Sequence, residues 1–134
     1  QVLCEKFVDG REFGCGAMCY KGKMMVFPLT EICSKNEFFD YEAKYTAGKC
    51  DEITPAQVDE DIEIEIKATT AMLYEKLECK GFVRMDYIVS DEGVLFIEAN
   101  IVPGMSDASI IPSQARCFGL TLEQLFGMAI ENVL

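Results

Sequence analysis

The residues best suited to chemistry are two acids, an arginine and an amide that are predicted to share one face of a β-hairpin: Arg84, Asp86, Glu98 and Asn100. Side chains that face each other in an antiparallel pair have Cβ atoms about 4.5–5.5 Å apart, and like charges at that distance are destabilising. The facing carboxylates of Asp86 and Glu98 therefore require a cation. Oxygen ligands without His or Cys suit a hard ion such as Mg²⁺, which completes its shell with water and phosphate. Arg84 adds a fixed positive donor suited to developing negative charge.

The hairpin that carries these residues consists of two predicted strands, 82–90 and 94–100, joined by the three-residue loop 91–93 with glycine at its left-handed position. Counting back from this loop places Asp86 opposite Glu98, and residues two apart share a face. A slip of one residue would put the two acids on opposite faces. The other face is predicted to join the core through Val83, Met85, Val89, Leu95 and Ile97.

From the pattern alone, a solvated sheet face on which Arg84 neutralises Asp86 or Glu98 explains the hairpin equally well. The segment that follows the hairpin favours a site. Pro103-Gly104-Met105 is a predicted turn, where glycine lets the backbone approach a ligand and a backbone N–H can stabilise an oxyanion. The alternative at that turn is a simple connection from a strand to a helix.

The composition excludes several classes of function. The chain has 23 acidic and 12 basic residues and a net charge of −11, whereas a nucleic-acid partner requires a basic face. No apolar run approaches the ~20 residues of a membrane span, so no membrane partner is expected. The lack of His removes Ser-His-Asp and Cys-His mechanisms from this chain. An odd count of seven Cys, without a Cys-x-x-Cys pair, predicts reduced, mostly buried thiols in a cytosolic protein.

The elements that must position these residues predict an α+β fold, in which a mainly antiparallel sheet packs against helices. Strands are predicted at 2–8, 11–20 and 24–29. A natural domain rarely starts inside a strand, so the chain is expected to be a fragment. Residues 36–53 are predicted to form a long loop, and loops of that length are often functional.

Capping signals predict the helices. The run 54–57 offers Thr54 as N-cap, Pro55 at the first helical position and Gln57 in a capping box, and Gly81 supplies the stop. The apolar stripe of this helix is Val58, Ile62, Ile66, Leu73 and Leu77. A short helix over 112–118 follows, and a second capping box at Thr121 to Gln124 opens the last helix.

Four motifs resemble those of the D-alanine–D-alanine ligases, in the order of that family and across essentially the whole chain. They are Glu5-Lys6-Phe7-Val8 with Glu12, Tyr41-Glu42-Ala43-Lys44-Tyr45, Gly81-Phe82-Val83-Arg84-Met85-Asp86, and Glu98-Ala99-Asn100-Ile101-Val102-Pro103-Gly104-Met105. Each motif is weak alone, but the ordered set is specific; Ile101 departs from the threonine usual in the family. The resemblance implies that 1–134 is the C-terminal part of an ATP-grasp domain, without the N-terminal substrate domain and the first ATP-grasp subdomain.

By this resemblance, the first motif binds ATP. Glu5 would accept from the adenine amino group, Lys6 and Val8 would meet the adenine edge through their backbone, Phe7 would pack near the ring, and Glu12 would hold the ribose hydroxyls. Without the resemblance, these residues are interpreted as ordinary strand and core residues.

The same resemblance assigns the chemistry of the other motifs. Asp86, Glu98 and Asn100 would bind two Mg²⁺ ions, with Mn²⁺ as a substitute, that bridge the nucleotide phosphates. Arg84 and the Gly104 backbone would steady the acyl-phosphate and the tetrahedral intermediate.

Three further residues, Lys44, Tyr45 and Ser109, are implied to close the site and place the second D-alanine. Lys44-Tyr45 is more similar to dipeptide-forming members than to depsipeptide-forming relatives. Without the resemblance, Lys44 and Tyr45 are interpreted as part of a solvated loop.

The implied activity is ATP-dependent ligation of two D-alanine molecules through an acyl-phosphate, for peptidoglycan synthesis in the bacterial cytoplasm, by a homodimer when full length. Phosphoryl transfer needs positioning and charge neutralisation more than a nucleophilic side chain, which suits a chain without His. The phosphate-binding lysines and glycine-rich loop of the family lie in the part that is absent, so this chain alone is expected to be inactive.

Two alternatives remain open from the sequence. Another ATP-grasp enzyme could join a different carboxylate and amine, although the loop at 41–45 argues against it. A non-catalytic acidic cation-binding module would bind metal without nucleotide and would give Glu5 and Glu12 no role.

Overall fold

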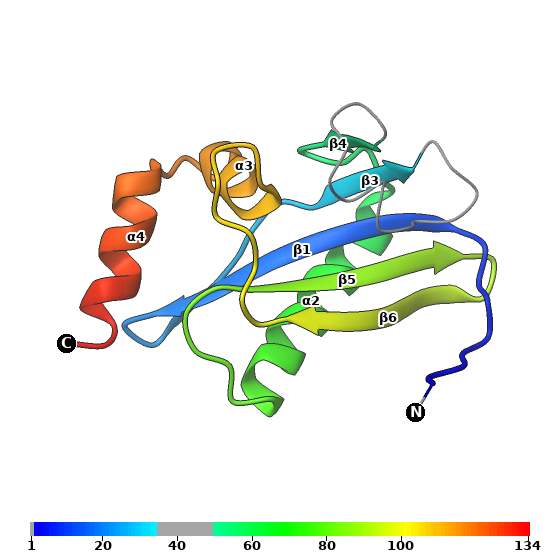
Figure 1. Ribbon diagram of the computed structural model, residues 1–134, viewed down its shortest axis with the longest axis horizontal. Helices are drawn as coiled ribbons and strands as arrows, with labels where there is room; N and C mark the ends of the chain where they lie inside the picture. Colours follow the sequence, from blue (N-terminus) through cyan, green and yellow to red (C-terminus); the bar gives the residue numbers. More distant parts are fainter. Residues whose placement is uncertain (1, 35–49) are drawn as a thin grey trace.

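The computed structural model describes residues 2–34 and 50–134, which form one antiparallel sheet with helices on both faces (Figure 1). The strands are β1 (Arg11–Tyr20), β2 (Lys23–Val26), β3 (Thr30–Ser34), β4 (Cys50–Ile53), β5 (Val83–Ser90) and β6 (Gly93–Asn100). The helices are α2 (Glu60–Lys76), α3 (Ile110–Cys117) and α4 (Leu122–Glu131). The predicted α+β class is confirmed.

Strand β1 lies at the centre of the sheet, whose order is β4-β3-β1-β5-β6 with β2 also paired to β1. One edge of β1 pairs with β5 over residues 11–17. The other edge pairs with β3 at residues 12–14 and with β2 at residues 17–20. Proline at position 28 has no N–H to give to a ladder, and the predicted strand 24–29 accordingly ends at Val26.

Strands β5 and β6 pair Asp86 with Glu98 as predicted, but the turn between the strands differs from the prediction. The turn is tighter than predicted, because Ser90 faces Gly93 across a two-residue loop. The resulting one-residue offset is cancelled by a bulge that leaves Ile97 without an opposite residue, so Asp86 still faces Glu98. Leu95 faces Ile88 on the Asp86 side of the sheet, and Ile97 is 49% exposed, so the prediction of core positions for these two is wrong.

The two faces of the sheet hold separate cores. Odd-numbered β1 residues pack with Val83, Met85 and Tyr87 of β5 against α2; the β1 members are Phe13, Cys15 and Ala17. On the other face, Met18 packs with Met25, Phe27, Ile111, Ala115 and Leu125 beneath α3 and α4. Glu12, Gly14 and Gly16 of β1 also lie on this second face, where Gly14 contacts Arg84 and Asp86 and Gly16 contacts α3.

The first residues of the chain do not form the predicted strand 2–8, because residues 2–9 have no regular secondary structure. Val2, Leu3 and Phe7 are 94%, 81% and 71% exposed, so these apolar side chains bury too little surface to hold the segment in a sheet. The predicted loop 36–53 is wrong at its end, where Cys50–Ile53 forms β4 on β3. The rest of that prediction lies outside the described residues.

Helix α2 begins later than the capping signal at Thr54 predicts. Its first residue is Glu60, and its N-cap Asp59 makes no side-chain cap hydrogen bond. The Thr54-Pro55 segment instead lies along β3, since the hydroxyls of Thr54 and Thr30 are 2.6 Å apart and the amide of Ala56 donates to the Leu29 carbonyl at 2.8 Å. Tertiary contacts therefore outweigh the local cap.

The end of α2 also differs from the prediction. The helix ends at Lys76, and Glu78 with φ 52° makes the reversal ahead of Gly81. Ile66 is buried and Leu73 packs on the core as predicted, but Leu77 is 54% exposed.

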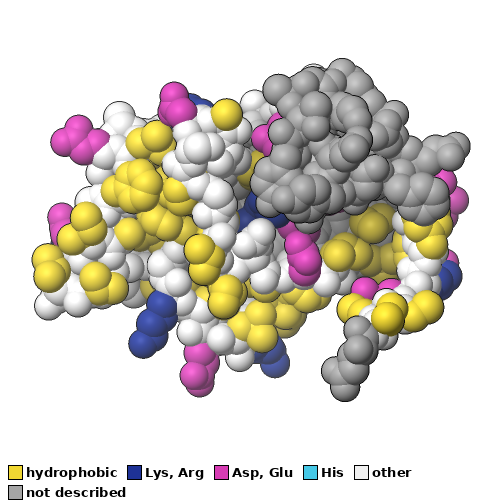
Figure 2. Space-filling model, viewed as in Figure 1, with side chains coloured by type: hydrophobic (Ala, Val, Ile, Leu, Met, Phe, Trp, Pro, Cys, Tyr) yellow, Lys and Arg dark blue, Asp and Glu magenta, His cyan; other side chains and the backbone are white. Residues whose placement is uncertain are grey.

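The last two helices follow the sequence closely. Helix α3 begins two residues before the predicted position and ends near Gly119, whose φ is 93°. The capping box at Thr121 and Gln124 is present at the start of α4. Hydrophobic side chains gather on the surface around α4 (Figure 2), where Phe118, Phe126 and Ile130 are 45%, 40% and 57% exposed.

Six cysteines have described side chains, and all six are free thiols. Only Cys15 is fully buried, three are partly buried and two are exposed, so the prediction of mostly buried thiols is wrong for these six. Burial raises the pKa of Cys15 to about 12, which keeps this thiol neutral and inert. Across 2–34 and 50–134, no helix is both long and apolar enough to cross a membrane.

Candidate functional site

The centre of the candidate site is a bidentate ion pair within β5. Arg84 donates from Nε to Oδ1 of Asp86 and from Nη2 to Oδ2, both at 2.8 Å. Arg84 thus neutralises Asp86, as the alternative interpretation of a solvated sheet face expects. The side chains are only 20% and 6% exposed, however, so the face is not solvated at this pair. Burial lowers the pKa of Arg84, but the hydrogen bonds and charges of Asp86, with the charges of Glu98 and Glu52, raise it above its ordinary value. Arg84 is a permanent cation facing three carboxylates.

Strand β6 supplies the second half of this group. Glu98 lies opposite Asp86, and Asn100 lies opposite Arg84. Glu98 is exposed and Asn100 is partly buried. The four predicted residues are therefore brought together, and the group is open to solvent on the β6 side.

The donor set fits a hard divalent cation. An ionised carboxylate offers about four lone-pair sites, and Arg84 uses one on each oxygen of Asp86. Among the residues that the structure describes, no three His, Cys, Asp or Glu side chains are grouped to hold a metal by themselves. A cation bound by the two facing acids and the Asn100 carbonyl would complete its coordination shell with water and phosphate, the shell that Mg²⁺ prefers. The metal role of Asp86, Glu98 and Asn100 stays a prediction.

The floor beneath the ion pair is Gly14 of β1, which pairs with Asp86. A Cβ at Gly14 would lie 3.4 Å from Oδ1 of Asp86 and 3.4 Å from Cδ of Arg84. Glycine therefore leaves the space in which the two charged side chains lie across β1.

The segment after β6 forms a compact turn that leads into α3. The hydroxyls of Ser106 and Ser109 are 2.8 Å apart, and the Ser109 amide donates to the Ser106 carbonyl at 2.8 Å. A Cβ at Gly104 would lie 2.9 Å from Oγ of Ser109, so these two predicted residues are in contact. Their proposed roles toward an acyl-phosphate and a second D-alanine stay predictions.

The predicted nucleotide residues lie at a different place. Glu5, Lys6 and Phe7 are exposed, and Lys6 donates to Glu92 of the β5–β6 turn at 2.6 Å. Val8 is partly buried in the same segment. The structure thus places this segment at the turn of the hairpin and does not join it to the carboxylates.

Glu12 lies nearer to the carboxylates, since it faces Ile88 of β5 on the same side of the sheet as Asp86. Lys44 and Tyr45 fall outside the described residues.

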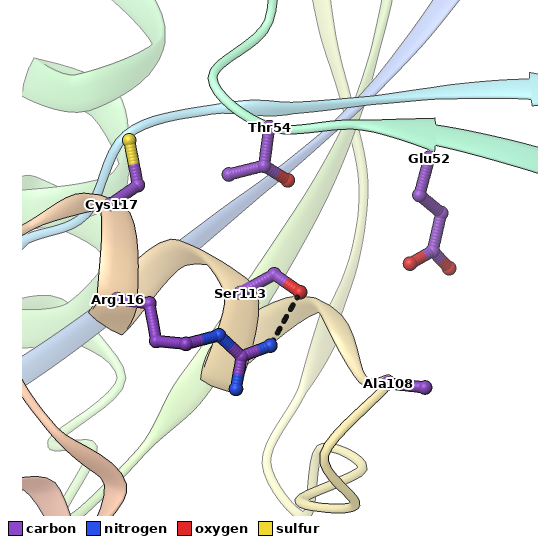
Figure 3. Close-up of a pocket in the computed structure, with 6 residues that line it drawn as sticks. All are labelled: Glu52, Thr54, Ala108, Ser113, Arg116 and Cys117. Carbon is purple, nitrogen blue, oxygen red and sulfur yellow. Dashed lines mark hydrogen bonds between the residues drawn. The ribbon is translucent and has the colours of Figure 1, made fainter.

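A cavity of about 640 Å³ lies between β4 and α3 (Figure 3). Its lining residues are Glu52, Thr54, Ala108, Ser113, Arg116 and Cys117. Arg116 donates to the side chain and the main-chain carbonyl of Asp107 at 3.0 and 2.8 Å and to Oγ of Ser113 at 3.3 Å. These contacts join the turn that contains Ser109 to helix α3.

Glu52 connects this cavity with the ion pair. Desolvation raises the pKa of Glu52, although much of the residue's surface is exposed, and the charge of Arg84 opposes that rise. Glu52 pairs with Ile32, which pairs with Glu12, so Glu52 lies on the same face of the sheet as Arg84.

Sequence analysis missed Glu52 and also Gln114 of α3. Glu52 lies at the end of a segment predicted to be a loop, so no strand pattern placed it on a face. Gln114 is fully buried, three residues after Ile111 and beside Ala115 on the buried side of α3. A polar residue on the apolar stripe of a short helix is the signal that would have identified it.

Solved structures with the same fold define the class of the domain. The VanG D-Ala:D-Ser ligase from Enterococcus faecalis superposes with a TM-score of 0.82 and 29% identity, covering 96% of this chain and 38% of that one. A D-alanine–D-alanine ligase from Bacillus anthracis complexed with ATP gives 0.75 and 30% identity, covering 96% and 41%. The fold is that of the ATP-grasp domain of these ligases.

The family follows from the sequence comparisons. The family model "D-ala D-ala ligase C-terminus" matches residues 1–131. The D-alanine–D-alanine ligase of Flavobacterium johnsoniae is 44% identical over 131 residues, which cover 98% of this chain and 40% of the relative. That of Christiangramia forsetii is 45% identical over 134 residues, covering 100% and 41%. The chain belongs to the D-alanine–D-alanine ligase C-terminal family, and it spans about two fifths of the length of these relatives.

Proposed function

We propose that this chain is the nucleotide- and metal-binding part of an enzyme that joins two D-alanine molecules with ATP, through an acyl-phosphate, for peptidoglycan synthesis. The observation that carries the proposal is the buried Arg84–Asp86 ion pair, with Glu98 facing Asp86 across the β5–β6 ladder. Supporting it, the relatives that match nearly the whole chain are named D-alanine–D-alanine ligases.

The residues of this chain would act by positioning and by neutralising charge. Bound ATP with Mg²⁺ would supply the phosphoryl group that activates the carboxylate of the first D-alanine. Asp86, Glu98 and Asn100 would hold the metal through oxygen donors. Arg84, held in place by Asp86, presents its remaining N–H groups to the oxygens of the activated carboxylate, where negative charge develops during attack by the amine.

The turn after β6 would complete the reaction site. The Gly104 amide would donate to the oxyanion of the tetrahedral intermediate. Ser109 would bind the second D-alanine, with Lys44 and Tyr45 closing over it. The reaction needs no nucleophilic side chain from this chain, because phosphoryl transfer depends on alignment and charge stabilisation.

Nucleotide recognition would involve the start of the chain. Glu5, Lys6, Phe7 and Val8 would contact adenine, and Glu12 would hold the ribose. The Bacillus anthracis relative, which was solved with ATP, supports nucleotide binding by a domain of this fold.

We further propose that the working enzyme contains an N-terminal substrate domain and a first ATP-grasp subdomain, acts in the cytoplasm and is a homodimer. Light scattering of the full-length parent tests the last point. A monomeric but active parent would contradict it.

The test of the activity is ADP release by the full-length parent with Mg-ATP and D-alanine, with L-alanine, D-lactate and D-serine as controls. D-serine is included because the VanG relative is a D-Ala:D-Ser ligase. ADP release that requires D-alanine and yields the dipeptide is the expected result. Release that requires another acid or amine would overturn the substrate assignment, and release with no amine would overturn the ligase assignment.

A further inference from the structure

The edge of β1 that faces β2 and β3 contains a gap in its hydrogen-bond ladder. Pairing with β3 ends at Gly14, and pairing with β2 begins at Ala17. The amide of Phe27 donates to the Gly16 carbonyl at 2.8 Å, but the next residue is Pro28, which has no N–H. The Gly14 carbonyl and the Gly16 amide lie in this gap, where buried polar groups require partners.

The side chain of Gln114 fills the gap. Its Nε2 donates to the Gly14 carbonyl at 2.9 Å and to Oγ1 of Thr30 at 3.1 Å, and its Oε1 accepts from the Gly16 amide at 3.0 Å. A carboxamide has one acceptor and one donor group, like a peptide unit, so it substitutes for the missing strand residue. Gln114 has 0% of its surface exposed, so water does not compete for these bonds.

This contact fixes the distance between α3 and the sheet. A Cβ at Gly16 would lie 2.5 Å from Oε1 of Gln114 and 2.5 Å from Cδ1 of Ile111, so the helix lies directly on the backbone of β1. The N-cap of α3 is Ser109. On the same strand, Gly14 is paired with Asp86 and lies under the Arg84–Asp86 ion pair.

We infer that Gln114 is a positioning residue that sets the place of Ser109 and Gly104 relative to Arg84 and Asp86. The inference rests on the proposed function, in which Arg84 and Gly104 bind the oxygens of the activated D-alanine and Ser109 binds the second D-alanine. Small displacements of aligned groups reduce rates on the order of a hundredfold. Loss of the carboxamide therefore affects the use of D-alanine more than the binding of ATP.

The experiment compares Gln114→Met and Gln114→Glu in the full-length parent, with Gln57→Met at an exposed position as the matched control. Gln114→Met keeps the length of the side chain but removes all three hydrogen bonds. We expect it to lower kcat/KM for D-alanine by about tenfold to a hundredfold, while the KM for ATP stays close to that of wild type. Gln57→Met is expected to match wild type.

Gln114→Glu adds a pH readout, which reports on positioning at each pH where circular dichroism shows that the variant is still folded. A protonated glutamic acid can donate to Gly14 and accept from Gly16, whereas the ionised form cannot donate. Burial raises the pKa of such a carboxyl. Relative to wild type at each pH, kcat/KM for D-alanine is therefore near normal at low pH and falls as the pH rises, while Gln114→Met is impaired throughout.

Circular dichroism and thermal unfolding give the folded fraction of each variant. Wild-type kinetics of Gln114→Met would overturn the inference. It would also be overturned if both variants lost activity only in proportion to their folded fraction, with no further fall in kcat/KM of Gln114→Glu as the pH rises. Failure of the wild-type parent to use D-alanine would overturn the proposed function and this inference with it. The wild-type assay therefore separates the two failures.

Discussion

At the scale of single residues, the proposed function gives Asp86 two cations to bind, Arg84 and a metal ion. Both of its oxygens accept from Arg84, and the Cδ atom of Arg84 and Oδ1 of Asp86 lie beside Gly14 of β1. The remaining lone pairs face Glu98, where a second positive charge would relieve the repulsion between the acids. Glu98 is exposed, so its removal is expected to affect function more than folding.

Glu98→Ala in the full-length parent is expected to reduce D-alanine-dependent turnover by about three orders of magnitude or more, because charge stabilisation by a metal contributes several kcal/mol to catalysis. ADP release measures this loss. The thermal unfolding midpoint should change little. Asp91→Ala, an exposed acid in the turn of the same hairpin, is the control and should retain activity. Wild-type turnover by Glu98→Ala would refute the metal role.

A second residue-scale prediction concerns pH. The two guanidinium nitrogens of Arg11 donate to both oxygens of Glu31 at 2.8 Å, and these hydrogen bonds lower the pKa of Glu31 from 4.5. A group with a lowered pKa in the folded state stabilises the fold above its unfolded pKa, and this contribution is lost as the pH falls through the folded pKa.

Glu31→Gln should therefore cost about 0.5–1 kcal/mol of unfolding free energy at neutral pH, a small value because Arg11 is half exposed. Urea denaturation of the variant and wild type at a series of pH values measures the difference. It should shrink as the pH falls below 4.5. A difference that stays constant or grows in acid would contradict the ion-pair explanation.

At the scale of elements, the hairpin shows how a correct pairing of Asp86 with Glu98 can follow from an incorrect prediction of the turn. Alternation and the glycine at position 93 correctly indicated two strands and the facing of Asp86 and Glu98. The two-residue turn and the bulge at Ile97 each shift the register by one residue and cancel. The pattern of apolar residues does not encode a bulge, because the bulge depends on how β6 packs, and this is why Leu95 was assigned to the wrong face.

Other elements differ because tertiary contacts outweigh local signals. The capping signal at Thr54 is real in the sequence, but its hydroxyl is bound to Thr30 of a strand 24 residues earlier. By contrast, the capping box at Thr121 and Gln124 is local and complete, and it was predicted correctly. The candidate site was predictable where residues alternate on neighbouring strands. Glu52 and Gln114 were not, since each depends on contacts between elements distant in sequence.

The close approach of α3 to β1 leads to a stability prediction. Gly16→Ala should destabilise the chain by about 2–3 kcal/mol, because its Cβ would meet Gln114 and Ile111 at 2.5 Å and displace the helix. Gly127→Ala is the matched control, since nothing lies within 4 Å of its Cβ position in α4. That variant should stabilise by about 0.5–1 kcal/mol through helix propensity.

Urea denaturation of the two glycine variants measures both changes. Equal effects of the two substitutions on the free energy of unfolding would show that the space between β1 and α3 can accept a side chain at position 16. A stabilised Gly16→Ala would contradict the proposed seating of α3 on the strand backbone.

At the scale of the whole molecule, apolar side chains remain uncovered around the site. Ile101 and Val102, directly after the metal-site strand, are 68% and 84% exposed, and Phe7 in the proposed adenine segment is 71% exposed. The relatives are about two and a half times as long as the segment that this chain matches. In the proposed whole enzyme, the additional length covers these residues and closes the nucleotide site.

The last prediction is that the 134-residue chain has no ligase activity, although the full-length parent does. Within the described residues, the cation of the site is Arg84, and it is already paired with Asp86, whereas transfer from ATP requires further positive groups around the phosphates. The purified chain, given Mg-ATP and D-alanine, should release ADP no faster than buffer, while the parent under the same conditions turns over. Circular dichroism of the chain confirms that it is folded. Dipeptide formation by the folded chain alone would mean that its own residues suffice to hold both substrates, and the division of labour proposed for the longer enzyme would be wrong.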